Sequence, residues 1–258
     1  MIKAAFFDID WTLYDHASHQ YISSGIEAIK KLKKQGVKCF ICTARPYNSM
    51  KLFGIFDLGI HWDGYICSAG AIAHVGRKCV RKLLMDKADV YAICHKAESM
   101  GYTVEIVCPQ SRFLIAPPNQ YVDGYHYVYQ YQLPRVHRYH GEDATGLLLF
   151  SPKESDEEIF SVRPHLDYYR FHECAVDVSG EPHSKGDAIV DVLKELGINK
   201  EETISFGDDI QDISMEKETG IFVCMGNGKP EVKEAANYVT DRIEDDGIVH
   251  ALEHFHLI

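Results

Sequence analysis

The chain has 258 residues, of which 46% are hydrophobic and 25% are charged. At about 150 residues per domain, this length allows one large domain or two small ones around a well-filled core. The formal net charge of -11 argues against a general nucleic-acid binder and against attraction to an anionic membrane surface.

Two further features concern the compartment. No apolar run approaches the roughly 18 to 20 residues of a membrane-spanning helix, and Asp8 and Asp10 interrupt any signal-peptide core. The eight cysteines show no framework spacing, so we expect reduced thiols in a cytoplasmic protein.

The first part of the chain alternates between strand and helix patterns. Ser24 and Glu27 have the spacing of a capping box at a helix start. Three short apolar runs end at Asp8, Thr43 and Ser68, and each is typical of a strand buried on both faces. Strand, helix and strand in this order imply a right-handed crossover and a parallel sheet. The predicted elements are a strand over 3–7, a helix between 22 and 36, and strands over 37–42 and 64–67.

The last part of the chain repeats this pattern. Ser184 can cap a helix that Gly197 closes. Two apolar runs follow, and they end at Gly207-Asp208 and at Gly226. The predicted elements are a helix over 185–196 and strands over 203–206 and 221–225. We expect both parts to share one α/β sheet.

The middle of the chain has a different pattern. Two alternating segments lie close together in the sequence, which is typical of antiparallel strands, and Asp86 can cap a helix before them. The predicted elements are a helix from 86 to 100, strands over 102–107, 112–115, 147–150, 168–171 and 175–178, and a helix over 152–163. Adjacent strands with two helices predict an α+β insert with an antiparallel sheet.

Turn-rich segments mark the limits of the insert. They lie at Gly76-Arg77 and Gly180-Glu181-Pro182. The sequence therefore predicts a discontinuous core domain over 1–77 and 184–258, with an inserted domain over 78–183. Within the insert, tyrosines alternate with other residues, which favours one aromatic face of a further strand. These tyrosines are Tyr125, Tyr127, Tyr129 and Tyr131.

Polar side chains follow several strands of the predicted sheet at the point where each strand ends. Asp8 and Asp10 follow the first strand, Thr43 the second, and Asp208 a later one, while Lys185 opens the helix before that later strand. In open parallel sheets, ligands bind at the carboxyl ends of the strands, so these side chains are expected to converge.

The chemistry of this group points to a cation and an anion together. Neighbouring carboxylates disfavour one another's ionised form, and a hard cation such as magnesium, with its oxygen ligands, relieves the repulsion. A magnesium ion also lets a carboxylate approach a phosphate. Lys185 at a helix N-terminus faces the positive end of the dipole, which costs about 0.3 to 1 kcal/mol unless an anion lies nearby.

Four segments resemble the motifs of the haloacid dehalogenase (HAD) superfamily of phosphatases, in the same order. The cap-sized insert and the tail motifs resemble its Cof-like sugar-phosphatase branch, with a subclass IIB type of cap. The segments are Asp8-Ile9-Asp10-Trp11-Thr12, Thr43 within 41–46, Ser184-Lys185-Gly186, and 207–212, and the tail motifs are 225–228 with Asp246-Gly247.

The resemblance implies a Rossmann-like parallel-sheet core with an inserted α+β cap, and a magnesium-dependent phosphatase. Its substrate would be a small phosphomonoester, such as a sugar phosphate or a similar metabolite. Asp8 would attack phosphorus and form an aspartyl phosphate. Asp10 would protonate the leaving oxygen and then activate water. Thr43 and Lys185 would hold the phosphoryl oxygens.

The resemblance also implies binding residues. Arg45 and Asn227 would contact the substrate. Asp8, Asp208 and the backbone carbonyl of Asp10 would hold magnesium, and Asp212 would support the metal site or Lys185.

Three positions depart from the family's pattern. Trp11 stands where a glycine is usual, Gln211 replaces a common asparagine, and the loop Ser68-Ala69-Gly70-Ala71 lies where relatives often carry asparagine and glycine. None of them removes the nucleophile, the acid, the lysine or the metal aspartate. His16 and His19 have ligand-like spacing, but with no cysteine cluster nearby they favour a solvated loop.

Alternatives stay open at this point. A phosphomutase of the same fold would return the phosphoryl group to its substrate. A phospho-accepting signalling module would also gather acids, a threonine and a lysine around magnesium, and a third alternative is a catalytically dead binding protein. The sequence leaves the particular substrate and the oligomeric state open.

Overall fold

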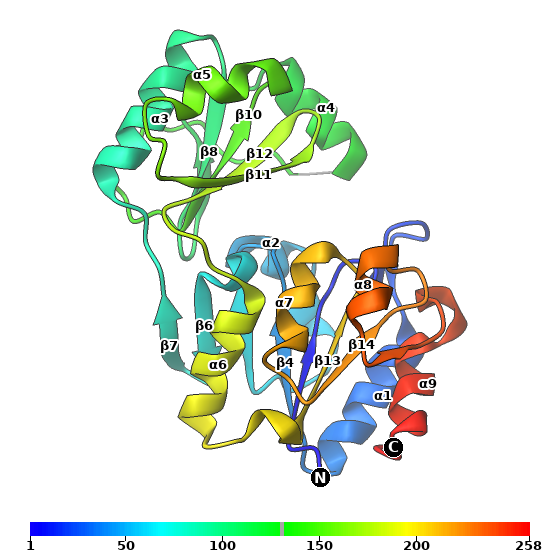
Figure 1. Ribbon diagram of the computed structural model, residues 1–258. Coiled ribbons are helices and arrows are strands. Elements are labelled where there is room, and N and C mark those ends of the chain that lie inside the picture. Colours follow the sequence, from blue (N-terminus) through cyan, green and yellow to red (C-terminus); the bar gives the residue numbers. More distant parts are fainter. Residues whose placement is uncertain (130–131) are drawn as a thin grey trace. The chain divides into compact units, whose positions relative to one another are not determined.

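The computed structural model describes residues 1–129 and 132–258, with side chains outside 126–131 (Figure 1). The chain divides into two compact units, which we call the core unit (1–82 and 183–258) and the insert unit (83–182). The predicted α/β class is confirmed. No helix among the described residues combines the length and the apolar character needed to cross a membrane.

The core unit contains a sheet with the strand order β15-β14-β13-β1-β4-β5-β6-β7. Neighbouring strands from β15 to β5 run parallel, whereas β6 pairs antiparallel with both β5 and β7. The strands are β1 (Ala4–Phe7), β4 (Lys38–Cys42), β5 (Gly64–Cys67), β6 (Ile72–Val75), β7 (Lys78–Lys82), β13 (Thr203–Gly207), β14 (Ile221–Cys224) and β15 (Tyr238–Val239). The predicted strands of both core segments are thereby confirmed.

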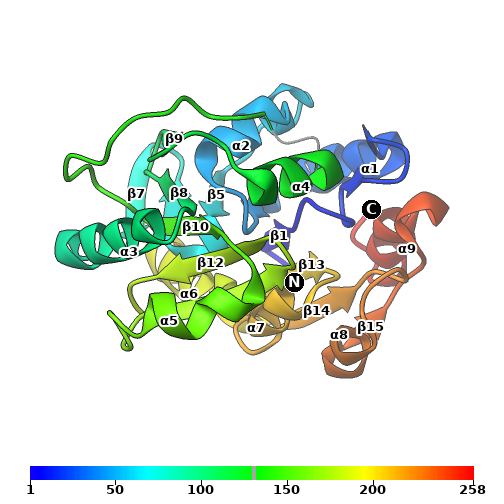
Figure 2. The ribbon, with the colours of Figure 1, turned by 90° about the horizontal axis from the view of Figure 1, so that it is seen from above.

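Helices cover both faces of the core sheet, because successive side chains of a strand point to opposite faces. Phe7 packs in one apolar cluster with Ile29, while Phe6 packs in another with Ile189. The first cluster takes in α1 (Ser23–Lys34), α2 (Tyr47–Leu52) and α9 (Gly247–His254), and the second takes in α6 (Lys185–Leu196), α7 (Ile213–Glu216) and α8 (Pro230–Ala235) (Figure 2). The central strands are therefore buried on both faces, as predicted.

Short elements complete the core unit. Directly after the first strand, the chain forms a hairpin of β2 (Tyr14–Asp15) and β3 (Gln20–Tyr21). The 3₁₀ turns are η1 (Ile55–Asp57), η2 (Ser68–Gly70), η4 (Lys200–Glu202), η5 (Ile210–Asp212) and η6 (Ile243–Asp245).

The helix caps were predicted correctly at α6 and incorrectly at α1. The Ser184 hydroxyl accepts a hydrogen bond from the Asp187 N–H, and Gly197 ends α6 in the left-handed conformation. The predicted capping box of Ser24 is wrong: α1 starts after Ile22 without a side-chain cap, and the Ser24 hydroxyl donates to Asp246 instead.

The insert unit contains an antiparallel sheet with the strand order β11-β12-β10-β8-β9. One face packs against α3 and α5, and the other carries a smaller apolar cluster that includes Val122 of α4. The elements are β8 (Thr103–Val107), β9 (Arg112–Leu114), β10 (Gly146–Phe150), β11 (Asp167–His172), β12 (Ala175–Ser179), α3 (Lys87–Ser99), α4 (Gln120–Tyr129), α5 (Asp156–Phe160) and η3 (Lys153–Ser155). The predicted α+β insert is confirmed.

Three details of the insert differ from the predictions. The predicted limit between 77 and 78 falls in the turn of the β6–β7 hairpin, which belongs to the core sheet. The helix predicted over 152–163 is the short α5 preceded by η3. The tyrosines at 125, 127 and 129 lie in α4 rather than in a strand, and Tyr131 lies outside the described residues.

The helical outcome for α4 has a local cause. The Asn119 carboxamide oxygen accepts hydrogen bonds from the backbone N–H groups of Tyr121 and Val122, at 3.0 and 3.1 Å. Asparagine favours this position at a helix start. Val122 and Tyr125, three residues apart, then face the same apolar cluster.

The two ends of the insert unit approach each other closely. A Cβ built on Gly180 would lie 3.4 Å from the Cα of Met85. The chain therefore leaves the core unit and returns to it through neighbouring segments of a folded insert.

Gly70 provides a test of how tightly the loop after β5 packs. Its φ is +104°, and a Cβ there would lie 2.1 Å from the Ser184 carbonyl oxygen. Gly76 also has a positive φ, +55°, but nothing lies within 4 Å of its Cβ position. We expect Gly76→Ala to lower the free energy of unfolding by about 1 kcal/mol and Gly70→Ala by more than about 3 kcal/mol. Urea unfolding measures the free energy of unfolding of both variants. Equal decreases would contradict the prediction and would show that the loop around Gly70 shifts to accommodate a Cβ atom.

Candidate active site

The predicted site residues lie where the central parallel strands end. Asp8 follows β1, Thr43 follows β4 and Asp208 follows β13, and these three strands are neighbours in the sheet. Lys185 is the first residue of α6. The structure therefore brings together side chains that are up to 200 residues apart in the sequence (Asp8 and Asp208).

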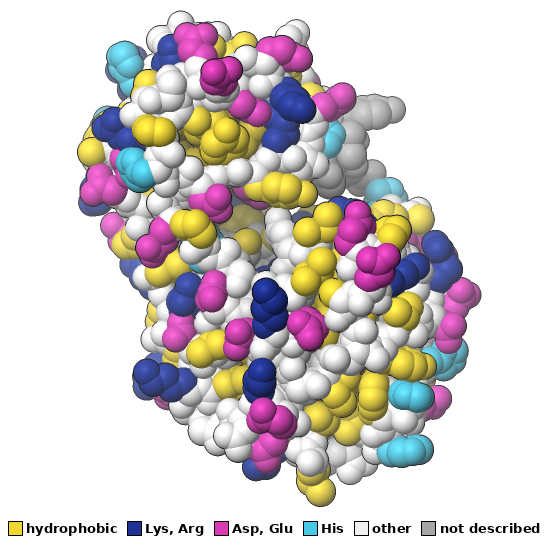
Figure 3. All heavy atoms as spheres, in the orientation of Figure 1, with side chains coloured by type: hydrophobic (Ala, Val, Ile, Leu, Met, Phe, Trp, Pro, Cys, Tyr) yellow, Lys and Arg dark blue, Asp and Glu magenta, His cyan; other side chains and the backbone are white. Residues whose placement is uncertain are grey.

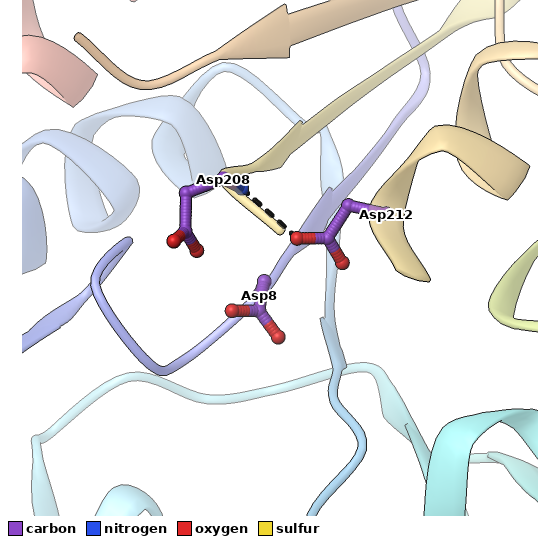
Figure 4. A group of neighbouring side chains, drawn as sticks. All are labelled: Asp8, Asp208 and Asp212. Atoms are coloured by element: carbon purple, nitrogen blue, oxygen red, sulfur yellow. Dashed lines mark hydrogen bonds between the residues drawn. The ribbon is translucent and has the colours of Figure 1, made fainter. Parts of the chain in front are cut away.

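Three buried carboxyl groups lie at the centre of this arrangement. Oxygen atoms of Asp8, Asp208 and Asp212 all lie within 4.8 Å of one another, and the three side chains point toward one another in Figure 4. Burial raises the pKa of Asp8 to about 8, although Lys185 lowers it. Burial and the charge of Asp212 raise the pKa of Asp208 to about 9. The group therefore lacks positive charge, and its hard oxygen ligands fit a divalent cation such as magnesium.

Lys185 supplies part of the missing charge. Its Nζ donates to Asp8 Oδ1 at 2.7 Å and to Asp212 Oδ1 at 2.6 Å, and the residue is only 3% exposed. Burial alone would lower the pKa of Lys185, but Asp212 and Asp8 outweigh that effect and raise it well above its usual value. The lysine is therefore an ammonium ion, and its partners at this helix N-terminus are the Asp212 and Asp8 carboxyl groups of the protein itself.

Asp212 acts as a support within the group. Its second oxygen accepts the backbone N–H groups of Asp208 and Asp209 at 2.9 and 3.0 Å. Since Lys185 occupies its first oxygen, Asp212 fixes both the lysine and the loop that carries Asp208. This contact fits its expected support of Lys185, and its part in a metal site stays a prediction. Thr12 makes a weaker contact, with Oγ1 3.4 Å from Asp208 Oδ1.

Asp10 lies in a separate network with Arg45. The guanidinium group donates from Nε to Asp10 Oδ2 at 2.8 Å and from Nη2 to Asp10 Oδ1. Arg45 is itself held by the Ser49 hydroxyl at 3.0 Å and lies over the Phe53 ring, 3.4 Å from its centroid. Thr43 is fully buried, and its hydroxyl oxygen accepts the backbone N–H of Arg45. The predicted substrate contacts of Thr43 and Arg45 stay predictions.

The Asp10 carboxylate has a second hydrogen-bond partner, which the sequence interpretation missed. His16 Nε2 lies 2.6 Å from Asp10 Oδ1, so the solvated-loop interpretation of His16 is wrong. Burial would raise the pKa of Asp10, but the hydrogen bond from His16 and the charge of Arg45 outweigh it and hold the pKa well below its usual range. The six-residue separation of His16 from Asp10 carried no signal, because the β2–β3 hairpin creates the contact.

The backbone conformation of Trp11 is one that glycine adopts more readily than tryptophan. Its φ is +57°, in the left-handed region that favours glycine. Asn227 holds the segment: Nδ2 donates to the Trp11 carbonyl oxygen at 2.8 Å, and Oδ1 accepts the N–H of Ile243 at 2.9 Å. The structure thus gives Asn227 a positioning contact, and its predicted contact with substrate stays a prediction.

The loop after β5 shows similar strain. Ser68 and Ala69 have φ values of +50° and +52°, in the left-handed region that favours glycine and asparagine. The loop is tied to the segment after β4, because Ser68 N donates to the Arg45 carbonyl oxygen at 2.9 Å. Trp11 and residues 68–69 therefore all hold a left-handed backbone conformation, which side-chain-bearing residues adopt less readily than glycine.

Comparison with known proteins agrees with this geometry. The model of the haloacid dehalogenase-like hydrolase family matches residues 5–252. YkrA of Bacillus subtilis (strain 168) is 28% identical over 99% of this chain and 98% of that protein, and the phosphatase YwpJ of the same organism is 25% identical over 98% and 99%. The solved structure of the HAD subclass IIB sugar phosphatase BT4131 is 32% identical, covers 99% of this chain and 100% of that one, and has a TM-score of 0.83.

The match covers nearly the whole chain and includes both core segments and the insert. It confirms the resemblance that the four motifs indicated. The chain belongs to the haloacid dehalogenase-like hydrolases, in their Cof-like subclass IIB branch, and is a phosphatase of that superfamily.

Proposed function

We propose that the protein hydrolyses a small phosphomonoester, such as a sugar phosphate, with magnesium and through a phosphoryl group on Asp8. The observation that carries the proposal is the contact of Lys185 with Asp8 and Asp212 beside the buried carboxyl of Asp208. BT4131, which resembles this chain over its whole length, is named a sugar phosphatase.

In the first step, an Asp8 oxygen bonds to phosphorus while the bond from phosphorus to the leaving oxygen breaks. Asp10 gives its proton to that leaving oxygen. Water then attacks phosphorus, gives its proton to Asp10, and breaks the bond to Asp8. Lys185 stabilises the charge that develops around Asp8 in both steps.

The proposed role of Asp10 requires a change in its surroundings, since Arg45 and His16 favour its ionised form. A phosphate dianion beside Asp10 raises the pKa of that carboxyl, because like charges disfavour ionisation. If Arg45 turns from Asp10 to the phosphoryl oxygens, the carboxyl also loses a cation. The movement of Arg45 to the substrate would then itself promote the protonation of Asp10.

Magnesium is the cofactor that we propose. Asp8, Asp208 and the backbone carbonyl of Asp10 are the residues that would hold it, and the raised pKa values of Asp8 and Asp208 support this choice. When bound, the ion would neutralise the carboxylates and polarise the phosphoryl group.

We also propose the cellular location of the protein and the kind of partner that it binds. All eight cysteines are free thiols, as in the reducing cytoplasm that we propose as its location. On the face seen in Figure 3, basic side chains are mixed with acidic ones rather than gathered into a patch. This distribution and the net charge of -11 favour a small phosphorylated metabolite over nucleic acid or a membrane as the partner.

Replacement of the nucleophile tests the mechanism. We expect Asp8→Asn to lower phosphate release from a panel of phosphorylated metabolites by at least about 10³-fold, because the amide cannot form the phosphoryl intermediate. The change is nearly isosteric, so the free energy of unfolding should stay within about 1 kcal/mol of the wild type. Asp57→Asn, at an exposed position of η1, is the matched control and should retain full activity.

The products decide between the alternatives. Release of inorganic phosphate over many turnovers supports the phosphatase. An isomerised ester without free phosphate would indicate a phosphomutase, and one stable phosphoryl group per chain would indicate a phospho-accepting module. Phosphate release that persists in the Asp8→Asn variant would refute the role of Asp8.

Removal of the metal should stop turnover. We expect a chelator to abolish phosphate release and added Mg2+ to restore it, because Asp8 and Asp208 then regain the cation that balances them. A phosphate assay before and after the addition measures this. Full activity in the presence of the chelator would refute the proposed cofactor.

The same carboxyls predict a pH dependence of stability. Between about pH 4 and pH 8, folded Asp8 and Asp208 keep protons that the unfolded chain has lost, since their pKa values rise from 3.8 to about 8 and about 9. The free energy of unfolding of the metal-free protein should therefore fall as the pH rises through this window. Mg2+ should raise Tm more at about pH 8 than at about pH 5.5, and Asp208→Asn should reduce that difference. A shift by Mg2+ that is equal at both pH values would contradict the assignment.

A further inference from the structure

The hairpin β2–β3 is a built structure that follows directly after Asp10. The Asp15 carboxylate is buried and accepts the backbone N–H groups of Ala17 and Ser18 at 2.8 and 3.1 Å, which fixes the turn. The Tyr14 ring packs edge-on against the rings of Tyr21 and Phe53. The hairpin is therefore held both at its turn and along its side.

His16 is placed by this hairpin. Its ring lies 5.3 Å from the Trp11 ring and 5.0 Å, edge-on, from the Tyr14 ring. Its side chain is 20% exposed, and Nε2 lies 2.6 Å from Asp10 Oδ1. An ionised carboxylate only accepts hydrogen bonds, so Nε2 carries the hydrogen of this contact.

The two partners of Asp10 come from different parts of the chain. Arg45 belongs to the segment after β4, whereas His16 belongs to the same loop as Asp10 itself. A change of partner by Arg45 would remove both of its hydrogen bonds to the carboxylate. The contact with His16 does not depend on Arg45, so it would keep the carboxyl in place during that change.

We propose that His16 is a positioning residue, which orients the Asp10 carboxyl toward the leaving oxygen. This inference rests on the function proposed above. His16 exchanges no proton in it: Asp10 gives a proton to the leaving oxygen as that oxygen separates from phosphorus, and takes one from water in the second step. The contribution of His16 is a hydrogen bond from Nε2 that fixes the direction in which the acid points.

A comparison of two aryl phosphates tests this role. The leaving group of p-nitrophenyl phosphate departs without a proton, whereas that of phenyl phosphate needs one. A misplaced acid should therefore slow the second substrate more than the first. A disturbance of the fold or of phosphate binding would slow both substrates alike.

The variants separate the hydrogen bond from the ring. His16→Phe keeps a ring against Trp11 and Tyr14 but has no donor. His16→Gln and His16→Met have similar shapes, and only Gln can donate. His19→Asn is the control, because His19 is an exposed histidine of the same hairpin and asparagine tolerates its φ of +56°.

We expect His16→Phe and His16→Met to lower kcat/KM about tenfold or more for phenyl phosphate. For p-nitrophenyl phosphate, the loss should stay below about threefold, with KM nearly unchanged. His16→Gln should restore most of the rate for phenyl phosphate, and His19→Asn should match the wild type for both esters. The Gln and Met variants also answer the question if His16→Phe does not fold.

Two results would overturn the inference. One is an equal loss for both esters in the Phe and Met variants. The other is a Gln variant that is no better than the Met variant. If the wild type cleaves neither ester nor any metabolite of the panel, the proposed phosphatase activity itself fails, which is a different outcome.

Discussion

The site depends on one buried ammonium ion shared by two carboxyl groups. Lys185 contacts Asp8 and Asp212 in a place that is almost closed to water. Loss of Lys185 would leave the buried carboxyl groups without their cation, at a cost of about 3 to 5 kcal/mol. Through Asp212, the same ion fixes the loop that carries Asp208. The sheet is needed because only its adjacent parallel strands bring these residues, far apart in sequence, to one point.

Two hydrogen-bond networks with different charges lie around this point. The first, with Lys185, Asp8, Asp208 and Asp212, collects negative charge and fits a cation. The second surrounds Asp10 with the cations and donors of Arg45 and His16. Asp8 therefore has a raised pKa and Asp10 a lowered one, which is the reverse of the order that a nucleophile and an acid need. The proposed cation beside Asp8 and the phosphate beside Asp10 would exchange that order.

The sequence predicted the elements whose signals are local and strong. Apolar runs buried on both faces marked the core strands, and the cap of α6 was readable at Ser184 and Gly197. The motif residues converged because parallel strands end at one edge of a sheet. The contact of His16 with Asp10 could not be predicted, since it depends on the path of a two-strand hairpin. Likewise, β6 and β7 were missed because they join the sheet antiparallel, after the pattern of parallel strands has ended.

The close approach of Gly180 to Met85 has a consequence for how the core unit closes. The two core segments are joined through 100 residues, from Leu83 to Pro182. A flexible connection of that length would resist closure more than one of a few residues, by about 2 to 3 kcal/mol of chain entropy. An insert that folds first removes most of this difference, because it holds its own ends together. A folded insert thus lowers the loss of chain entropy that accompanies the pairing of β1 with β13, which belong to different core segments.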